Sequence, residues 1–222
     1  MEGIRACVFD AYGTLFDVHS AVGRLRPQIG THADALSQLW RTKQLEYSWL
    51  RALMGRHADF WQVTGEALDY ALARAEVDAS VREPLMQAYL TLEAYPEVGD
   101  VLRRLRAAGL KLAILSNGEP AMLAAAVENA GIGTLLDAVI SVEEAGVYKP
   151  DPRVYRLAVD RLAVRADQIA FQSSNAWDVN GAACFGLRPV WINRFGAPAE
   201  RLPGDAEHEL RDLSGLPGLL GA

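Results

Sequence analysis

The sequence predicts an α/β fold in which a doubly wound parallel sheet carries an inserted helical segment. Short apolar, β-prone runs alternate with helical patterns from residue 96 to residue 192, which is the signature of a parallel sheet with right-handed crossovers. The chain also opens on such a run, Arg5 to Asp10, and residues 16–95 have helical patterns without a convincing strand. We therefore expect a main domain, residues 1–15 and 96–222, and an inserted helical-bundle cap domain, residues 16–95.

The cap domain is expected to contain four helices. The first opens at Asp17 or His19 and ends before Pro27. The other three are predicted at about residues 33–54, 59–76 and 81–93. The helix over 33–54 has apolar residues at helical spacing, at Leu36, Leu39, Trp40, Leu45, Trp49, Leu50 and Leu53.

The main domain resumes at Pro96 as alternating helices and strands. Helices are predicted at about residues 98–108, 120–130, 152–162 and 175–185. Strands are predicted at about residues 110–118, 138–142, 168–173 and 189–192. A Leu-rich turn over residues 213–220 closes the chain.

Length and composition limit the classes of function. With 222 residues, half of them apolar, the chain can bury a full core. A formal net charge of −6 argues against nucleic-acid binding, because that binding requires a basic face. No run is long enough to cross a membrane and no signal peptide is recognisable, so we expect a cytoplasmic protein. Cys7 and Cys184 are expected to be buried thiols, and the four His to be surface or packing residues.

Asp10 is the first candidate catalytic residue. It ends the first predicted strand and is followed directly by a Gly-containing turn. Ligands and chemistry in an open parallel sheet lie at the carboxyl ends of the strands. The alternative for Asp10 is a structural one, the capping of a turn.

Polar residues also follow other predicted strands. Ser116-Asn117 ends one strand, and Ser173-Ser174-Asn175, with Asp178 one turn later, ends another. Lys149 lies in a loop that leads into a helix. Each could be a helix cap or a solvated side chain. If the sheet is parallel, however, all of them face one crevice together with Asp10.

The chain resembles the haloacid dehalogenase superfamily over nearly its whole length. Four motifs occur in that superfamily's order: Phe9-Asp10-Ala11-Tyr12-Gly13-Thr14-Leu15, Ser116-Asn117-Gly118, Lys149-Pro150 and Ser173-Ser174-Asn175-Ala176-Trp177-Asp178. Within it the chain is similar to the type II L-2-haloacid dehalogenases, whose cap the segment from Leu36 to Tyr47 also resembles. The resemblance implies a Rossmann-like core with an inserted cap.

Departures from the superfamily's phosphatases favour dehalogenation. Those enzymes carry a second Asp two residues after the nucleophile, where this chain has Tyr12, and Ser173 replaces one of their acidic metal ligands. A Mg²⁺ site needs several oxygen ligands, whereas a halide leaves without a proton or a metal. The resemblance therefore implies no metal and no cofactor.

The reaction implied is the hydrolytic conversion of an L-2-haloalkanoic acid to a D-2-hydroxyacid. Asp10 attacks C2 with inversion, halide departs, and water hydrolyses the Asp10 ester. Lys149 balances the charge of Asp10, and Arg41 accepts the halide together with Asn117. Ser116 and backbone N–H groups near Ala11 and Asn117 hold the substrate carboxylate.

The resemblance assigns the remaining site residues to the apolar pocket and to ester hydrolysis. The apolar wall comprises Tyr12, Leu45, Phe60 and Trp177. The residues expected to hold Asp10 or to position and activate water are Thr14, Tyr155, Ser173, Asn175 and Asp178. From the residues alone, Phe60 and Tyr155 could equally be packing residues, and Arg41 could be a solvated helix residue.

Two other functions remain open from the sequence. One is a phosphatase or a related hydrolase on the same fold, and the other is a non-catalytic interaction module. The expected partners are a 2-haloacid substrate, water and the halide product, with neither nucleic acid nor membrane. The long helix with Trp40, Tyr47 and Trp49 further suggests a homodimer.

Overall fold

The main domain is an α/β structure built on one parallel sheet. The computed structural model describes residues 1–222. Its six strands lie in the order β3-β2-β1-β4-β5-β6, and each adjacent pair is parallel. The strands are β1 (Ala6–Phe9), β2 (Lys111–Ser116), β3 (Ala138–Ser141), β4 (Ile169–Ser173), β5 (Arg188–Ile192) and β6 (His208–Leu210). The predicted fold class is confirmed.

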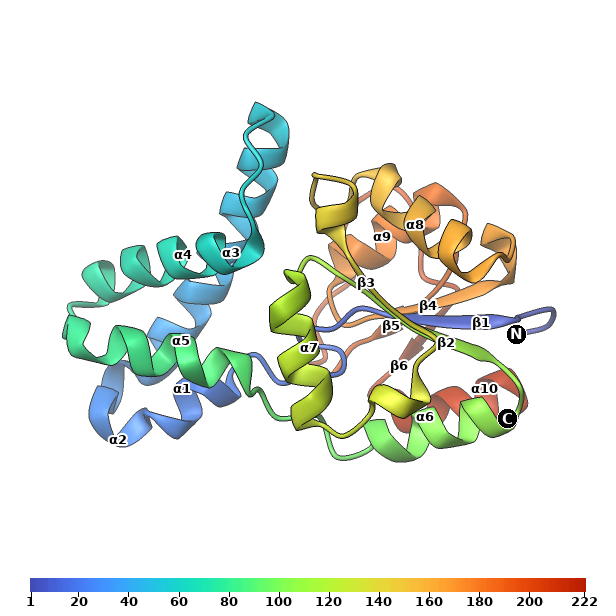
Figure 1. The fold of residues 1–222 in the computed structure, drawn as a ribbon, viewed down its shortest axis with the longest axis horizontal. Coiled ribbons are helices and arrows are strands. Elements are labelled where there is room, and N and C mark those ends of the chain that lie inside the picture. Colours follow the sequence, from blue (N-terminus) through green and yellow to red (C-terminus); the bar gives the residue numbers. More distant parts are fainter.

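Helices cover both faces of this sheet. They are α6 (Val98–Ala107), α7 (Pro120–Asn129), α8 (Pro152–Leu162), α9 (Ala176–Phe185) and α10 (Leu216–Leu220). Figure 1 shows α8 and α9 on one face and α6 and α10 on the other. The four central strands β2, β1, β4 and β5 are short and largely buried, as expected for a sheet covered on both faces, whereas the edge strand β6 is mostly exposed.

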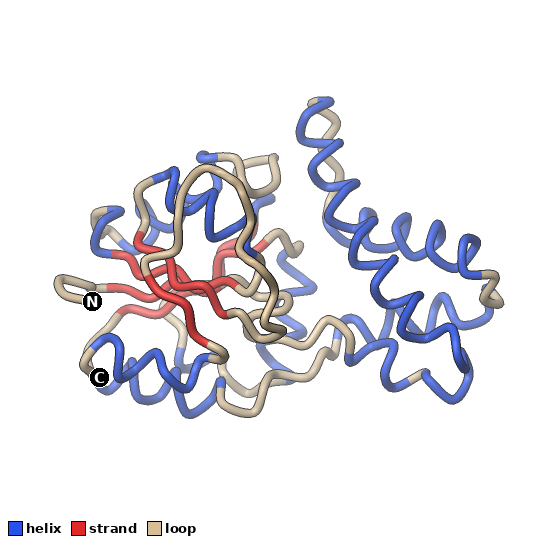
Figure 2. The backbone as a smooth tube through the Cα atoms, turned by 180° about the vertical axis from the view of Figure 1, so that it is seen from behind, coloured by secondary structure: helices blue, strands red, loops and turns tan.

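The segment between β1 and α6 is helical and lies to one side of the sheet (Figure 1). Its helices are α1 (Ser20–Arg24), α2 (Arg26–Ile29), α3 (Ala33–Met54), α4 (Phe60–Ala75) and α5 (Arg82–Leu90). Figures 1 and 2 show α3 as its longest helix, with α4 and α5 packed beside it. We refer to residues 16–95 as the helical segment. The division into two domains stays a prediction, because one cluster of buried apolar residues includes members of both parts.

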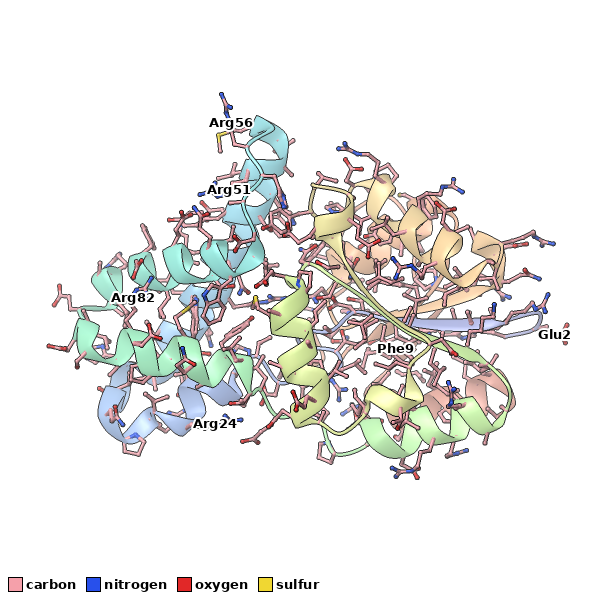
Figure 3. All side chains as sticks on the ribbon, in the orientation of Figure 1. Glu2, Phe9, Arg24, Arg51, Arg56 and Arg82 are labelled. Carbon is pink, nitrogen blue, oxygen red and sulfur yellow. The ribbon has the colours of Figure 1, made fainter.

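The helical segment joins this common core through aromatic side chains. Phe9 from β1 lies within the packed interior of the sheet domain (Figure 3). Tyr12, just after that strand, packs against Phe60 and Tyr89 of the helical segment, with ring centroids 5.9 and 5.5 Å apart. The helices are therefore packed directly onto the edge of the sheet that carries Asp10.

Helix α3 buries only some of its apolar residues, together with polar ones. The buried row is Leu36, Trp40, Gln44 and Ser48, each four residues apart. Leu50 is 44% exposed and Leu53 is 84% exposed. The beginning of α3 packs on α4, while its last turns extend beyond the body of the segment, as Figure 3 shows around Arg51 and Arg56.

The first predicted helix is confirmed as α1, which begins after His19 and ends before Pro27. Other local predictions were wrong. The short helix α2 was not predicted, so residues 16–95 contain five α-helices and not four. Pro27 lies near the start of α2, where a missing N–H costs no hydrogen bond. The short edge strand β6 was not predicted, because only three residues form it. Cys184 is exposed, whereas Cys7 is buried as expected. No helix is both long and apolar enough to span a membrane.

Candidate active site

The register of the sheet brings the predicted site residues to one edge. Phe9 of β1 pairs with Gln172 of β4, so Asp10 and Ser173 leave the sheet side by side. Phe9 also pairs with Ile114 of β2, two residues before Ser116. The carboxyl ends of three adjacent strands therefore meet at the crevice where an open α/β sheet binds its ligands.

Asp10 is held on both carboxylate oxygens. Oδ1 accepts a hydrogen bond from Lys149 Nζ at 3.1 Å. Oδ2 accepts from Asn175 Nδ2 at 2.8 Å and from Thr14 Oγ1 at 3.2 Å, and Ser173 Oγ lies 3.5 Å away. The carboxylate is only slightly exposed and is fixed in orientation by these donors.

The turn after β1 positions Thr14. Gly13 has φ of +91°, and a Cβ there would lie 2.9 Å from Ser174 Oγ, so only glycine fits this turn. Thr14 Oγ1 donates to Asp10 and accepts from the backbone N–H of Ser174 at 2.8 Å. The turn is thereby tied to the residue that follows β4.

Lys149 bridges two buried carboxylates. Its Nζ lies 3.1 Å from Asp10 Oδ1 and 2.8 Å from Asp178 Oδ2, and all three side chains are almost fully buried. Burial alone would lower the pKa of Lys149, but attraction to Asp10 and Asp178 outweighs it and raises that pKa. The two carboxylates therefore favour the charged form of Lys149.

Asp178 is fully buried between Lys149 and Tyr155. Burial raises the pKa of Asp178, and Lys149 offsets this only in part. Asp178 Oδ1 also accepts a hydrogen bond of 2.7 Å from Tyr155 OH. Tyr155 is buried and stands perpendicular to Phe171, so its hydroxyl points at Asp178 rather than at solvent.

Arg41 belongs to α3, and its guanidinium group lies at this edge of the sheet. One guanidinium nitrogen, Nη2, donates to Asn175 Oδ1 at 3.3 Å and to the backbone oxygen of Tyr12 at 3.5 Å. The other, Nη1, donates to Gln44 Oε1 at 2.7 Å. Asn175 thus connects Arg41 on one side with Asp10 on the other.

Ser116 and Asn117 also lie buried at this edge, but their side chains bond to nearby backbone. Ser116 Oγ accepts from the N–H of Gly118 at 3.0 Å, and Asn117 Oδ1 accepts from the N–H of Lys149 at 3.1 Å. Arg41 and Asn117 share no hydrogen bond. Their predicted joint binding of halide stays a prediction, as do the roles of Ser116 and Ala11 in binding the substrate.

The predicted apolar wall is only partly assembled around Asp10. Tyr12 and Phe60 are buried and pack together, and the Tyr12 hydroxyl is buried without a hydrogen-bond partner. Trp177 packs perpendicular to Trp49 and lines a cleft of about 490 Å³ that also contains Lys149 and Tyr148. Leu45 is half-buried, one turn after Arg41.

Several residues that contact the predicted site were missed. Gln44, Thr64 and Tyr89 form a buried polar group behind Arg41. The sequence signal for this group is the polar Gln44 four residues after Trp40, on the same face of the helix. No set of three or more His, Cys, Asp or Glu side chains is placed to hold a metal ion.

The comparisons with known proteins agree with this geometry. The family model of haloacid dehalogenase-like hydrolases matches residues 4–186. The chain is 51% identical to (S)-2-haloacid dehalogenase 1 of Pseudomonas sp. strain CBS-3, over 99% of this chain and 98% of that protein. A crystal structure of a dehalogenase, 48% identical, has a TM-score of 0.98 and the match covers 100% of this chain and 99% of the other.

A second solved structure is that of the L-2-haloacid dehalogenase from Xanthobacter autotrophicus with chloropropionic acid covalently bound. It is 41% identical, with a TM-score of 0.90, and the match covers 97% of this chain and 98% of the other. The chain therefore belongs to the haloacid dehalogenase-like hydrolases and, within them, to the (S)-2-haloacid dehalogenases, also called L-2-haloacid dehalogenases.

Proposed function

We propose that the chain converts L-2-haloalkanoic acids to D-2-hydroxyacids through an ester on Asp10. As a member of its family, it is a hydrolase that acts on carbon–halogen bonds. One observation carries the proposed mechanism. The Asp10 carboxylate is oriented by Lys149 and Asn175, while Arg41, on the other side of Asn175, has no carboxylate partner.

In the first step, an oxygen of Asp10 attacks C2 of the substrate from the side opposite the halogen. The new bond joins this oxygen to C2, and the carbon–halogen electron pair leaves with the halide. Configuration at C2 inverts once. Nucleophile and substrate are both anions, and two unit charges 4 Å apart repel by about 4 kcal/mol at an effective dielectric of 20. Lys149 and Arg41 supply the two positive charges that offset this repulsion.

Arg41 receives the departing halide. It enters from α3, opposite the strand ends, and can donate to an anion that forms only as the reaction proceeds. Such a donor stabilises the transition state more than the bound substrate. Buried aromatic side chains, including Tyr12 and Phe60, limit access of water to this step.

In the second step, water attacks Cγ of the Asp10 ester. Asp178 takes the proton of the attacking water, since burial has raised its pKa. The bond between Cγ and the ester oxygen then breaks, and that oxygen takes the proton from Asp178 and leaves as the hydroxyl group of the product. The Asp10 carboxyl group releases the second proton of the water to solvent and becomes a carboxylate again. Thr14, Ser173 and Asn175 hold the carboxyl group of Asp10 while this occurs.

A single turnover in H₂¹⁸O with excess enzyme tests the ester. Label is expected in the Asp10 carboxylate, because water attacks Cγ and not C2. Label that enters the hydroxyacid directly would exclude the ester intermediate. Release of phosphate from phosphate esters, abolished by a chelator, would instead support the phosphatase reading.

We also propose that the chain forms a homodimer through the apolar end of α3. Leu50, Leu53 and Met54 are exposed there. Trp40, which was included in the predicted surface, is buried and donates to the backbone oxygen of Thr64 at 2.9 Å. Sedimentation of the Leu53→Asp variant tests the dimer, since a charge at the contact would favour the monomer.

A further inference from the structure

Arg41 is a cation held only by neutral acceptors. Its three partners are the amide oxygens of Gln44 and Asn175 and the backbone oxygen of Tyr12. Other arginines of the chain, such as Arg51 and Arg82, pair with carboxylates. The positive charge of Arg41 is therefore oriented by hydrogen bonds without being neutralised.

Hydrogen bonding fixes which way the Gln44 amide points. Arg41 can only donate, so the Gln44 atom 2.7 Å from Nη1 must be the oxygen. Gln44 Nε2 then faces Thr64 Oγ1 at 2.7 Å and the oxygen of Tyr89 at 3.1 Å. Thr64 uses its own hydrogen to donate to the backbone oxygen of Phe60 at 2.6 Å, so it accepts from Gln44.

These bonds form a directed chain from the backbone of α4 to the guanidinium. The Phe60 carbonyl orients Thr64, Thr64 orients the Gln44 amide, and the amide oxygen orients Arg41. Gln44 and Thr64 are buried, as is Tyr89, so water does not compete with these bonds. The chain begins at the first turn of α4, whose Phe60 side chain packs against Tyr12.

We propose that Gln44 is a positioning residue that orients Arg41 and keeps its charge uncompensated for the departing halide. This inference rests on the proposed function. A carboxylate at position 44 would form an ion pair with Arg41 and neutralise the charge that the halide needs. A thioether or an aliphatic group would leave Arg41 Nη1 without its acceptor and Thr64 Oγ1 without its donor.

The variants Gln44→Glu and Gln44→Met test this role, with Ser48→Ala as the matched control. Ser48 is buried one turn further along α3 and donates only to the backbone oxygen of Leu45. Quench-flow single turnovers with excess enzyme, followed by mass measurement of the protein, give separate rates for ester formation and ester hydrolysis.

Ester formation is expected to slow by about 100-fold in Gln44→Glu, the effect of losing one preorganised charge-stabilising donor. Ester hydrolysis should keep its wild-type rate, because Arg41 acts on the leaving halide. Gln44→Met should slow formation less, and Ser48→Ala should change neither rate. If Gln44→Glu does not fold, Thr64→Val, which removes the acceptor for the Gln44 amide, should still slow formation selectively.

A purely structural role gives a different pattern. Both rates would then fall together, or only the unfolding temperature would drop, and either result would overturn the proposal. The proposed function fails separately: if the wild-type enzyme turns over substrate without ever carrying the ester mass, the mechanism itself is wrong. A second expected result concerns inhibition of the enzyme by added chloride or bromide. This inhibition should be lost in Gln44→Glu and kept in Ser48→Ala.

Discussion

The two sides of the site handle charge in opposite ways. At the sheet edge, Lys149 lies between Asp10 and Asp178, and every charge there has an opposite partner within 3.1 Å. On the helical side, Arg41 is surrounded by amide and backbone oxygens. Burying charges costs free energy unless they are paired and hydrogen-bonded, so the unpaired cation is the exception that needs a functional explanation.

The difference assigns each side to a different stage of the reaction. A carboxylate that is hydrogen-bonded on both oxygens keeps a fixed orientation, which suits the nucleophile. An oriented but unpaired cation attracts an anion that appears only when the carbon–halogen bond breaks. Removing the positive charge that pairs with Asp10 should therefore affect both steps, whereas changes around Arg41 should affect only the first.

Lys149→Met is expected to have the largest effect. It leaves two buried carboxylates without a counter-charge, so activity should fall by at least about 1000-fold. Breaking a buried ion pair costs about 3–5 kcal/mol of unfolding free energy. Denaturant unfolding monitored by circular dichroism measures this loss, and Lys149→Arg is the control that keeps the charge.

The pH dependence of the Lys149→Met variant provides a further check. Without Lys149, the pKa of Asp178 rises further in the folded state, while carboxyl groups of the unfolded chain keep pKa values of about 4. The folded state then binds a proton that the unfolded state does not, so the stability of the variant should increase as the pH falls from 7 toward 5. A decrease over this range would contradict the charge assignment at the sheet edge.

The same two regions also differ in how far the sequence could predict them. Asp10, Ser173 and Asp178 follow strands, and a parallel sheet must bring strand ends together, so their meeting follows from topology. Gln44 and Tyr89 come from different helices, and nothing in a helical pattern specifies how two helices cross. The apolar positions of α3 do not identify its buried row for the same reason, since Leu53 is apolar but is 84% exposed.

Arg41→Ala should have the next largest effect. The rate of ester formation is expected to fall by about 100- to 1000-fold, because the departing halide loses its main donor. The unfolding temperature should change little, since Arg41 is only half-buried and forms no ion pair. Fluoride, the poorest leaving group, should show the greatest loss and iodide the smallest. A uniform loss for all halogens would argue against a role in halide departure.

Tyr155→Phe should have a smaller effect, confined to the second step. The phenyl ring keeps its packing on Phe171, but Asp178 loses the hydrogen bond from the hydroxyl. That bond lowers the pKa of Asp178, so its removal raises the pKa further. As the pH falls, Asp178 of the variant therefore becomes protonated, and inactive as a base, at a higher pH than in the wild type. Ester hydrolysis should slow by about tenfold, the value of one hydrogen bond to a charged group, and its acidic limb should shift to higher pH.

His57→Ala should have the smallest effect, and it tests how the helical side is held over the sheet edge. His57, in the connection from α3 to α4, lies 2.9 Å from Glu143 in the segment after β3, and both side chains are about one-quarter exposed. Exposed pairs of this kind contribute less than about 1 kcal/mol and are screened by salt.

The neighbouring Tyr148 explains why so little should be lost. Its hydroxyl donates to the backbone oxygen of Ala58, and its ring packs on Phe60. These contacts keep the two sides together when the contact between His57 and Glu143 is removed. We therefore expect an unchanged kcat and a slightly higher KM in His57→Ala, measured by steady-state halide release. A large fall in kcat would instead mean that Arg41 depends on this pair for its position above Asp10.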